Sequence, residues 1–356
     1  MKGAASLPKA EDSAMEAGKR RGTKAGWEDR GYPQGKRGIA LLTVIWVLTV
    51  LMVIVLSFSF MARTETLSTL AFKEGTEKRF WAEAGLERGI WELFYRKTRS
   101  NPPLSEEEAP WKIDGTPYKG QIGQGNYLVR IMDESGKVDL NTAPEQVLRT
   151  LITSLVGEVT DADALVDCIL DWRDKDDLHR LKGAESDYYE SLPKPYKAKN
   201  GDFDSLEELL LVKGMTPQLL YGEKNKKGLA DFLTVYSRTN RVNINTAPKE
   251  VLLAIPGVSA DMVEEILAYR KNQEIKNLQE IGGTVAQNQA RIFPYFSFAP
   301  VGVFTVESLG FKDTPRAGYK VKTTVALTAD NRYKTYYYKT PVTIKDEEGP
   351  SETALP

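Results

Sequence analysis

The chain has 356 residues, of which 41% are hydrophobic and 27% are charged, and its formal net charge is −1. This length allows two or three domains with real cores, and the balanced charge gives no global sign of a nucleic-acid partner. One cysteine, Cys168, excludes an internal disulfide, and one histidine, His179, disfavours charge-relay triads and His-rich zinc sites.

The first segment is a basic leader followed by a long apolar run. Residues 1–38 contain nine Lys or Arg and five Asp or Glu, and residues 39–62 contain no charge. As a helix the run would be about 36 Å long, enough for a hydrocarbon core of about 30 Å, and it is too long for a signal-peptide core. A buried core helix is the alternative, but such helices seldom lack a polar face. The positive-inside rule predicts a cytoplasmic leader and export of everything after Arg63.

The junction of these two segments resembles a prepilin signal. Lys36-Arg37-Gly38 is followed at once by Ile39-Ala40-Leu41-Leu42. A prepilin peptidase cuts after such a glycine, so we predict processing between Gly38 and Ile39; on the simpler interpretation Gly38 only flanks a helix. Pilins usually carry Glu at the fifth residue after the cut, where this chain has Thr43. A buried Glu is costly unless it pairs with a partner such as the N-terminal amine of a neighbouring subunit. The absence of this Glu therefore suggests a subunit that has no other subunit ahead of it in the filament.

A second, amphipathic helix is predicted to continue from the membrane span over residues 63–100. Its end is expected near Ser100, before Pro102-Pro103. We expect Leu86 and Phe94 of its apolar stripe to contact partner subunits. The stripe consists of Leu67, Leu70, Phe80, Ala84, Leu86, Ile90, Leu93 and Phe94.

An internal repeat occupies the middle of the chain. Residues 138–148, Val-Asp-Leu-Asn-Thr-Ala-Pro-Glu-Gln-Val-Leu, recur at residues 242–252 as Val-Asn-Ile-Asn-Thr-Ala-Pro-Lys-Glu-Val-Leu. Each copy predicts an extended piece, a turn and a helix. Thr142 with Glu145 fits a capping box, while the second copy keeps only the Thr246 cap.

Helix-hairpin-helix-like units follow the repeat. One has its hairpin at Gly257, and another combines a Ser205–Glu208 capping box with Gly214 and a helix opened by Thr216. Such hairpins can bind DNA, but the second glycine is missing and the region is acidic, so phosphate binding lacks its main source of affinity. A structural or protein-contacting role is the preferred interpretation, and no nucleic acid is expected.

Alternating patterns predict strands on both sides of this region. They lie at residues 118–123 and 126–132, with a turn at Gly125-Asn126, and at residues 304–311, 317–328 and 332–340. The predicted class is α+β: a pilin-like transmembrane and stalk helix packed on an antiparallel sheet, with an all-α domain inserted between strands. The predicted ranges are a leader at 1–38, the span at 39–62, the stalk at 63–100, sheet at 101–138, the insertion at 139–290, sheet at 291–345 and a disordered tail at 346–356.

These features together resemble the minor pseudopilin K family of type II secretion systems. The resemblance rests on the Gly38 junction without the following Glu, the Ala82–Arg88 stretch, both Asn-Thr-Ala-Pro copies, and residues 171–189 and 207–214. It implies an inner-membrane, single-pass subunit that joins other minor pseudopilins at the tip of a short periplasmic pseudopilus. Processing by a prepilin peptidase, with methylation, is also implied. The 38-residue leader is long for the family, which an early start codon could explain.

The resemblance further implies calcium binding. Six carboxylates lie within 17 residues of one another, and hard cations take six to eight oxygen ligands. The alternative is a solvated acidic loop, because the spacing is not that of an EF-hand. The candidate ligands are Asp171, Asp174, Asp176, Asp177, Glu185 and Asp187.

The expected role is a structural and assembly subunit for protein export. Two alternatives share the same export chemistry: a minor pilin of a type IV pilus, and a DNA-uptake pilin whose hairpins contact DNA. The large insertion favours the secretion system over the pilus. An enzyme is not expected, because no nucleophile, base and orienting group are recognisable together.

Overall fold

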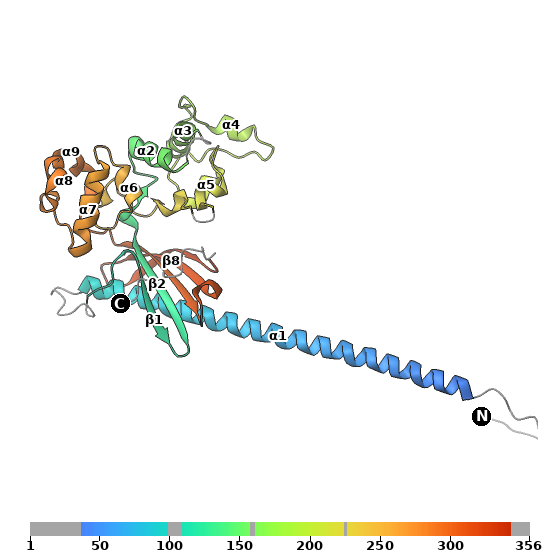
Figure 1. Cartoon of the computed structure of the whole chain (residues 1–356). Coiled ribbons are helices and arrows are strands. Elements are labelled where there is room, and N and C mark those ends of the chain that lie inside the picture. Colours follow the sequence, from blue (N-terminus) through green and yellow to red (C-terminus); the bar gives the residue numbers. More distant parts are fainter. Residues whose placement is uncertain (1–36, 99–108, 157–160, 224–225, 343–356) are drawn as a thin grey trace, which may run out of the picture. The chain divides into compact units, whose positions relative to one another are not determined.

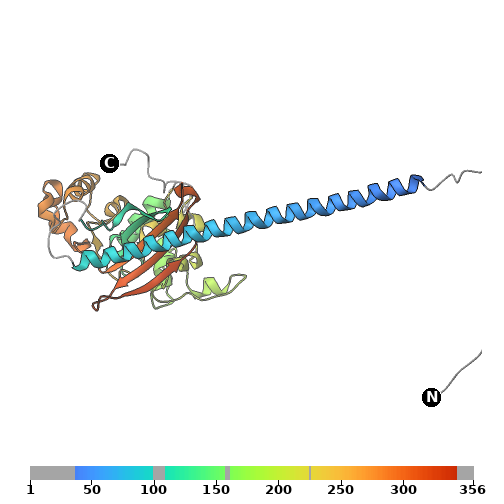
Figure 2. The same ribbon diagram turned by 90° about the horizontal axis from the view of Figure 1, so that it is seen from below.

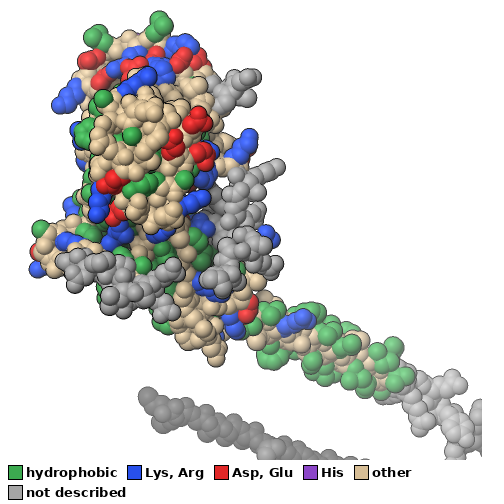
Figure 3. All heavy atoms as spheres, turned by 60° about the vertical axis from the view of Figure 1, so that its left-hand side comes forward, with side chains coloured by type: hydrophobic (Ala, Val, Ile, Leu, Met, Phe, Trp, Pro, Cys, Tyr) green, Lys and Arg blue, Asp and Glu red, His purple; other side chains and the backbone are tan. Residues whose placement is uncertain are grey.

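The computed structural model describes residues 37–98, 109–156, 161–223 and 226–342, so residues 1–36 of the predicted leader and the whole predicted tail lie outside the described residues. Two compact units are distinguished, Met1–Leu67 and Ser68–Pro356. Helix α1 (Arg37–Thr98) runs without a break, as the sequence predicts. Among the described residues it is the one helix long and apolar enough, from Ile39 onward, to cross a membrane. Its side chains from 39 to 62 are exposed, and Figure 3 shows hydrophobic groups around this part.

A five-stranded antiparallel sheet forms in the second unit, in the order β1-β2-β7-β8-β9 (Figure 1). All five predicted strands are found, which confirms the antiparallel sheet. The hairpin turn is shifted, however: Ile122 pairs with Gly125, so the turn lies at Gly123-Gln124 and not at Gly125-Asn126. The strands are β1 (Asp114–Ile122), β2 (Gly125–Asp133), β7 (Val303–Phe311), β8 (Tyr319–Leu327) and β9 (Tyr333–Lys339).

The C-terminal part of α1 packs across one face of this sheet (Figure 2). Glycines make the approach close: a Cβ on Gly89 would lie 2.8 Å from Val306, and one on Gly85 would collide with Ser308. The prediction that Leu86 and Phe94 face partner subunits is therefore wrong. Leu86 is buried and Phe94 packs against the same core, because the stripe covers the chain's own sheet.

The segment between β2 and β7 carries most of the remaining helices and has its own core, from Val138 to Phe296. In Figure 1 its helices α2, α3 and α5 lie on the far side of the sheet from α1. The helices are α2 (Glu145–Val156), α3 (Ala162–Arg173), α4 (Ser186–Glu190), α5 (Pro217–Tyr221), α6 (Lys249–Leu253), α7 (Ala260–Asn272), α8 (Gly283–Gln287) and α9 (Gln289–Ile292).

Short 3₁₀ turns and two-residue strands complete the chain, so the inserted segment is not entirely helical. The 3₁₀ turns are η2 (Glu134–Gly136), η3 (Leu206–Leu211), η4 (Leu229–Asp231), η5 (Leu278–Ile281), η6 (Phe293–Tyr295) and η7 (Pro315–Ala317). The short strands are β3 (Val138–Asp139), β4 (Leu233–Thr234), β5 (Val242–Asn243) and β6 (Phe296–Ser297).

The sequence repeat proves to be a structural duplication. The first copy opens with β3, which pairs in parallel with β4, and the second opens with β5, which pairs in parallel with β6. In each copy an arginine near the end of the second helix donates to two carbonyls of the Asn-Thr-Ala-Pro turn. Arg173 binds the oxygens of Leu140 and Ala143, and Arg270 binds those of Ile244 and Ala247.

The helix caps differ from those predicted. Thr142 bonds Asp139 instead of capping α2, and α6 begins after Pro248 with no side-chain cap. Glu208 accepts from the backbone of Asp204, not from that of Ser205. Proline at the residue before each helix displaces the start of α2 and α6 past the threonine, since its ring fixes the local backbone. The predicted Thr216 cap of α5 is confirmed, because its side chain accepts from the Leu219 amide.

Candidate metal centre

The acidic residues lie in a long loop whose two ends are fixed to the first Asn-Thr-Ala-Pro turn. Helix α3 ends at Arg173, which holds that turn, and Asp174 follows directly. At the other end, Asn141 exchanges two hydrogen bonds with the backbone of Phe203, at 2.7 and 3.0 Å. The ends of segment 174–202 are therefore set by the core of the duplication.

Three of the predicted ligands converge within this loop. Asp174, Asp176 and Glu185 each offer a carboxylate oxygen, and these oxygens lie within 4.8 Å of one another. The Glu185 side chain is only 1% exposed, yet neither of its carboxylate oxygens has a hydrogen-bond partner, and Asp174 Oδ1 is likewise buried and unpartnered. Buried polar atoms normally have partners, so these orphaned oxygens could accept a cation as their partner.

Asp171 lies beside this group but is already bonded. It is fully buried and accepts from the Arg180 guanidinium at 2.7 Å, and the same nitrogen also binds Asp174 Oδ2. Gly183 is required here, because a Cβ at that position would overlap Asp171 Oδ2. Asp171 is thus held next to the three converging carboxylates by an arginine and a glycine.

The last two predicted ligands lie apart from the three-carboxylate group. Asp177 accepts a hydrogen bond from the Asn200 side chain at 2.9 Å. Asp187 is exposed and pairs with His179 at 2.9 Å. The structure thus brings together Asp174, Asp176 and Glu185, with Asp171 alongside, and it does not bring Asp187 to them.

The electrostatics of the group reflect this crowding. Burial, together with the charges of Asp171, Asp174 and Asp177, raises the pKa of Glu185 to about 7. A carboxyl group in this state either keeps its proton or needs a cation to ionise. The loop therefore contains a carboxylate that is poorly compensated at neutral pH.

This donor set fits a hard divalent cation. Calcium is bound by carboxylate and carbonyl oxygens, and three of the unpartnered oxygens belong to two of the carboxylates that converge, Asp174 and Glu185. Among the described residues the convergent group consists of carboxylates alone, without a cysteine or histidine, which disfavours a zinc-type site. The residues present therefore fit calcium, with Asp174, Asp176 and Glu185 as the ones that would hold it.

Two residues of this site were not predicted. Arg180 brings a positive charge to Asp171 and Asp174, and Asn200 has a buried, unpartnered side-chain oxygen while its amide donates to Asp177. The Asn200-Gly201 dipeptide is a turn signal, and Asn200 adopts a φ of 49°. That signal would have drawn attention to Asn200, whereas nothing in the spacing identifies Arg180.

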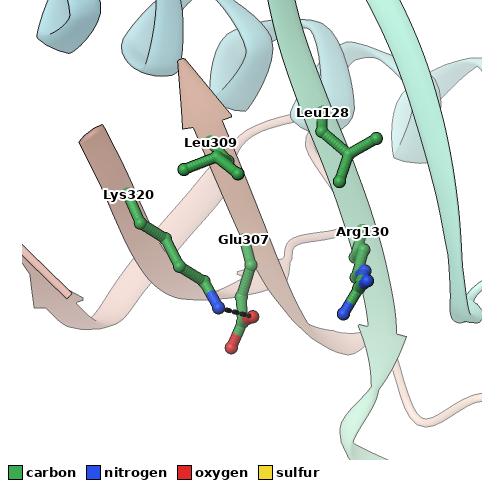
Figure 4. Close-up of a pocket in the computed structure, with 5 residues that line it drawn as sticks. All are labelled: Leu128, Arg130, Glu307, Leu309 and Lys320. Carbon is green, nitrogen blue, oxygen red and sulfur yellow. Dashed lines mark ion pairs between the residues drawn. The ribbon is translucent and has the colours of Figure 1, made fainter. Parts of the chain in front are cut away.

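A second polar group lies on the sheet face turned away from α1 (Figure 4). Glu307 accepts from Lys320 at 2.8 Å and from Lys322 at 3.1 Å, and Arg130 is its neighbour across β2. The lysine charges hold the pKa of the buried Glu307 well below its usual range. The carboxylate of Glu307 is thus engaged with two lysines on this face of the sheet.

Comparison with known proteins agrees with the fold. Residues 126–222 match the family model described as type II secretion system protein K. The type II secretion system protein K of Pectobacterium carotovorum is 26% identical over 197 residues, which are 52% of this chain and 60% of that protein. The protein K of Pseudomonas aeruginosa is 26% identical over 272 residues, covering 70% of this chain and 79% of the relative.

A solved structure shares the fold. It is the GspK-GspI-GspJ complex of the enterotoxigenic Escherichia coli type 2 secretion system, and the matched chain superimposes with a TM-score of 0.57 at 16% identity. The match covers 78% of this chain and 100% of that chain. Taken with the long apolar helix, the antiparallel sheet and the inserted helices, these matches show that the chain is similar in sequence to type II secretion system protein K and shares the fold of the matched GspK-GspI-GspJ chain.

Proposed function

We propose that this chain is a minor pseudopilin of a type II secretion system, acting as a structural and assembly subunit in protein export. The observation that carries the proposal is the packing of a membrane-length helix on an antiparallel sheet interrupted by helices that match protein K. The related GspK was solved in complex with GspI and GspJ. We infer by analogy that other minor pseudopilins are the partners of this chain, and that it is not an enzyme.

The proposed location is the inner membrane, with a single pass, a cytoplasmic N-terminus and a periplasmic C-terminal bulk. The support is the span from Ile39 and the basic residues before it. A prepilin peptidase would cut between Gly38 and Ile39, at the start of α1. The test is N-terminal sequencing of the protein purified from membranes, which should begin at Ile39; a protein that starts at Met1 or after Ala62 would refute the processing.

The proposed place of the subunit is the tip of the pseudopilus. Thr43 occupies the position of the usual pilin Glu, and its hydroxyl donates to the Ala40 carbonyl of its own helix at 2.9 Å. This side chain thus presents no charge to a neighbouring subunit's amine. A subunit of this kind can be first in a filament, because nothing ahead of it has to be neutralised.

We further propose that the loop binds calcium through Asp174, Asp176 and Glu185, with Asp171 and Asn200 beside them. A bound calcium ion would supply positive charge to the orphaned oxygens and join Glu185, in the middle of the loop, to Asp174 and Asp176 at its start. Calorimetric titration of the metal-free full chain in detergent micelles tests this. Saturable binding that Glu185→Gln removes is expected, and heats equal to those of dilution would leave only the solvated-loop interpretation.

A further inference from the structure

The Arg180 side chain lies where its charge opposes that of an incoming cation. Its guanidinium bridges Asp171 and Asp174, and the Arg180 backbone amide also points to Asp171, at 3.3 Å. We propose that Arg180 is an internal counter-ion that competes with calcium and lowers the affinity of the site. The inference rests on the proposed calcium site and goes beyond it by assigning a residue that sets how tightly the ion binds.

Two other basic side chains of the acidic region are engaged elsewhere. Lys182 bonds Asp161 at 2.7 Å, and Arg149 bonds Glu145, Asp163 and Asp167. Arg180, in contrast, bonds Asp171 and Asp174. It takes Asp174 Oδ2 and leaves Oδ1 of the same carboxylate without a partner. One oxygen of Asp174 therefore bonds the arginine, while the other belongs to the three-carboxylate group with Asp176 and Glu185.

The chemistry of arginine makes this competition unavoidable. A guanidinium stays protonated at any pH at which the protein is folded, so it cannot give way by losing its proton. A cation that reaches Asp174 meets the arginine's charge a few ångströms away, in a partly buried setting where such charges are felt strongly. Because the Arg180 side chain is about one-third exposed, it can move toward solvent when the cation binds.

The same contacts give Arg180 a role in the metal-free protein. Asp171 is fully buried, and Glu185 next to it is almost so; each would raise the free energy of the fold if left with no cation nearby. Arg180 partly neutralises the group, at the expense of calcium affinity. Removing its charge should therefore weaken the metal-free fold and strengthen calcium binding, which are opposite effects of one substitution.

The test compares calcium affinities of the full chain in detergent. Affinity is measured by competition with a chelator starting from the calcium-loaded protein, so that a stable metal-free fold is not needed. Arg180→Gln and Arg180→Met, which both remove the charge, should bind calcium roughly tenfold more tightly. Arg180→Lys, which keeps the charge, should stay within about twofold of the wild type. The gain from neutralisation should shrink as salt is raised, because ions screen the repulsion.

Arg149→Gln is the matched control, since this arginine binds three carboxylates of the same region but not the convergent group. Its calcium affinity should be unchanged. If the wild type binds calcium and both neutral Arg180 variants bind equally or more weakly, the inference is wrong while the calcium site stands. If neither the wild type nor the neutral variants bind, the calcium proposal itself fails. Binding by the neutral variants alone would show the competition directly.

Discussion

Glu185 shows what one buried carboxyl group costs this fold when no cation is present. Its pKa is raised to about 7, first by burial and then by the neighbouring aspartates, so the folded state holds a proton that the unfolded state releases near 4.5. A raised carboxyl pKa contributes stability that is complete at pH values below about 4.5 and is lost as the pH rises through about 7. The metal-free protein should therefore become less stable over this interval.

We predict that Glu185→Gln removes this pH dependence. In chelator, the wild-type melting temperature should fall by roughly 3–5 °C between pH 5 and pH 8 from this group, and the variant should lack that fall. Calcium should raise the melting temperature of the wild type at pH 8 and leave the variant unchanged. Differential scanning fluorimetry of the full chain in detergent measures both. Glu190→Gln, a change at the exposed last residue of α4, the helix that follows Glu185, should behave like the wild type.

Arginines that bind carbonyls carry a second prediction at this scale. Arg270 is held by two carbonyl oxygens of the second repeat, and burial lowers its pKa without depriving it of charge. Arg270→Met would leave both oxygens without this donor and should lower the free energy of unfolding by about 2–4 kcal/mol. Arg332→Met, at an exposed position, should stay within about 0.5 kcal/mol. Equal losses in chemical unfolding of the two variants would contradict the assigned role.

Helix α1 depends on glycines where it meets the sheet. A Cβ on Gly89 would lie 2.8 Å from Val306 and 2.9 Å from Val129, whereas one on Gly75 would meet nothing within 4 Å. Both residues lie in the same helix and in the same compact unit. Alanine raises helix propensity equally at the two sites, so only the packing differs.

We predict opposite effects of alanine at these two glycines. Gly75→Ala should stabilise the protein by up to about 1 kcal/mol through helix propensity. Gly89→Ala should be destabilising by about 1–2 kcal/mol, because the new methyl group overpacks the helix–sheet contact. Denaturant unfolding followed by circular dichroism measures both. If the two variants shift the midpoint in the same direction, the close approach of helix and sheet is not what limits this position.

The elements themselves could largely be predicted from sequence. Alternation along β7 and β8 and the long apolar run of α1 follow from periodicity alone, and the repeat follows from identity. Contacts between distant segments could not be predicted. The sequence predicts Thr142 and Thr246 as helix caps, but Thr142 bonds Asp139 of β3 and Thr246 bonds Asp133 at the end of β2. Arg180 reaches Asp171 and Asp174 only because the loop folds back, and the spacing of residues along the chain does not reveal this fold.

For the molecule as a whole, the surface available to partners is the part of α1 that its own sheet leaves uncovered. Phe80 is 62% exposed and Trp91 is 54% exposed, and Trp91 stacks on Tyr95. Large exposed aromatic residues are typical of protein interfaces. They replace Leu86 and Phe94, which are engaged with the sheet, as the candidate contacts with other minor pseudopilins.

We predict that Phe80→Arg and Trp91→Arg reduce co-purification with partner pseudopilins at least tenfold, an effect of about 1.4 kcal/mol or more. Their melting temperatures should stay within about 2 °C of the wild type, because neither side chain is part of the core. Leu86→Arg should instead unfold the protein, since it buries an unpaired charge. Glu264→Lys, at an exposed position of α7, is the control. Retained complexes with both aromatic variants would place the interface elsewhere.

The two repeats close the same scaffold with loops of very different length. The first repeat has residues 174–202 between Arg173 and Phe203, whereas the second has only residues 271–274 between Arg270 and Ile275. The two hydrogen bonds that Asn141 makes with the backbone of Phe203 recur between Asn245 and Ile275. Duplication has thus left one copy as plain scaffold and freed the other to carry an elaborated loop. Because the anchoring bonds are the same for both lengths, the long loop can change in length and composition while the scaffold that holds its ends stays the same.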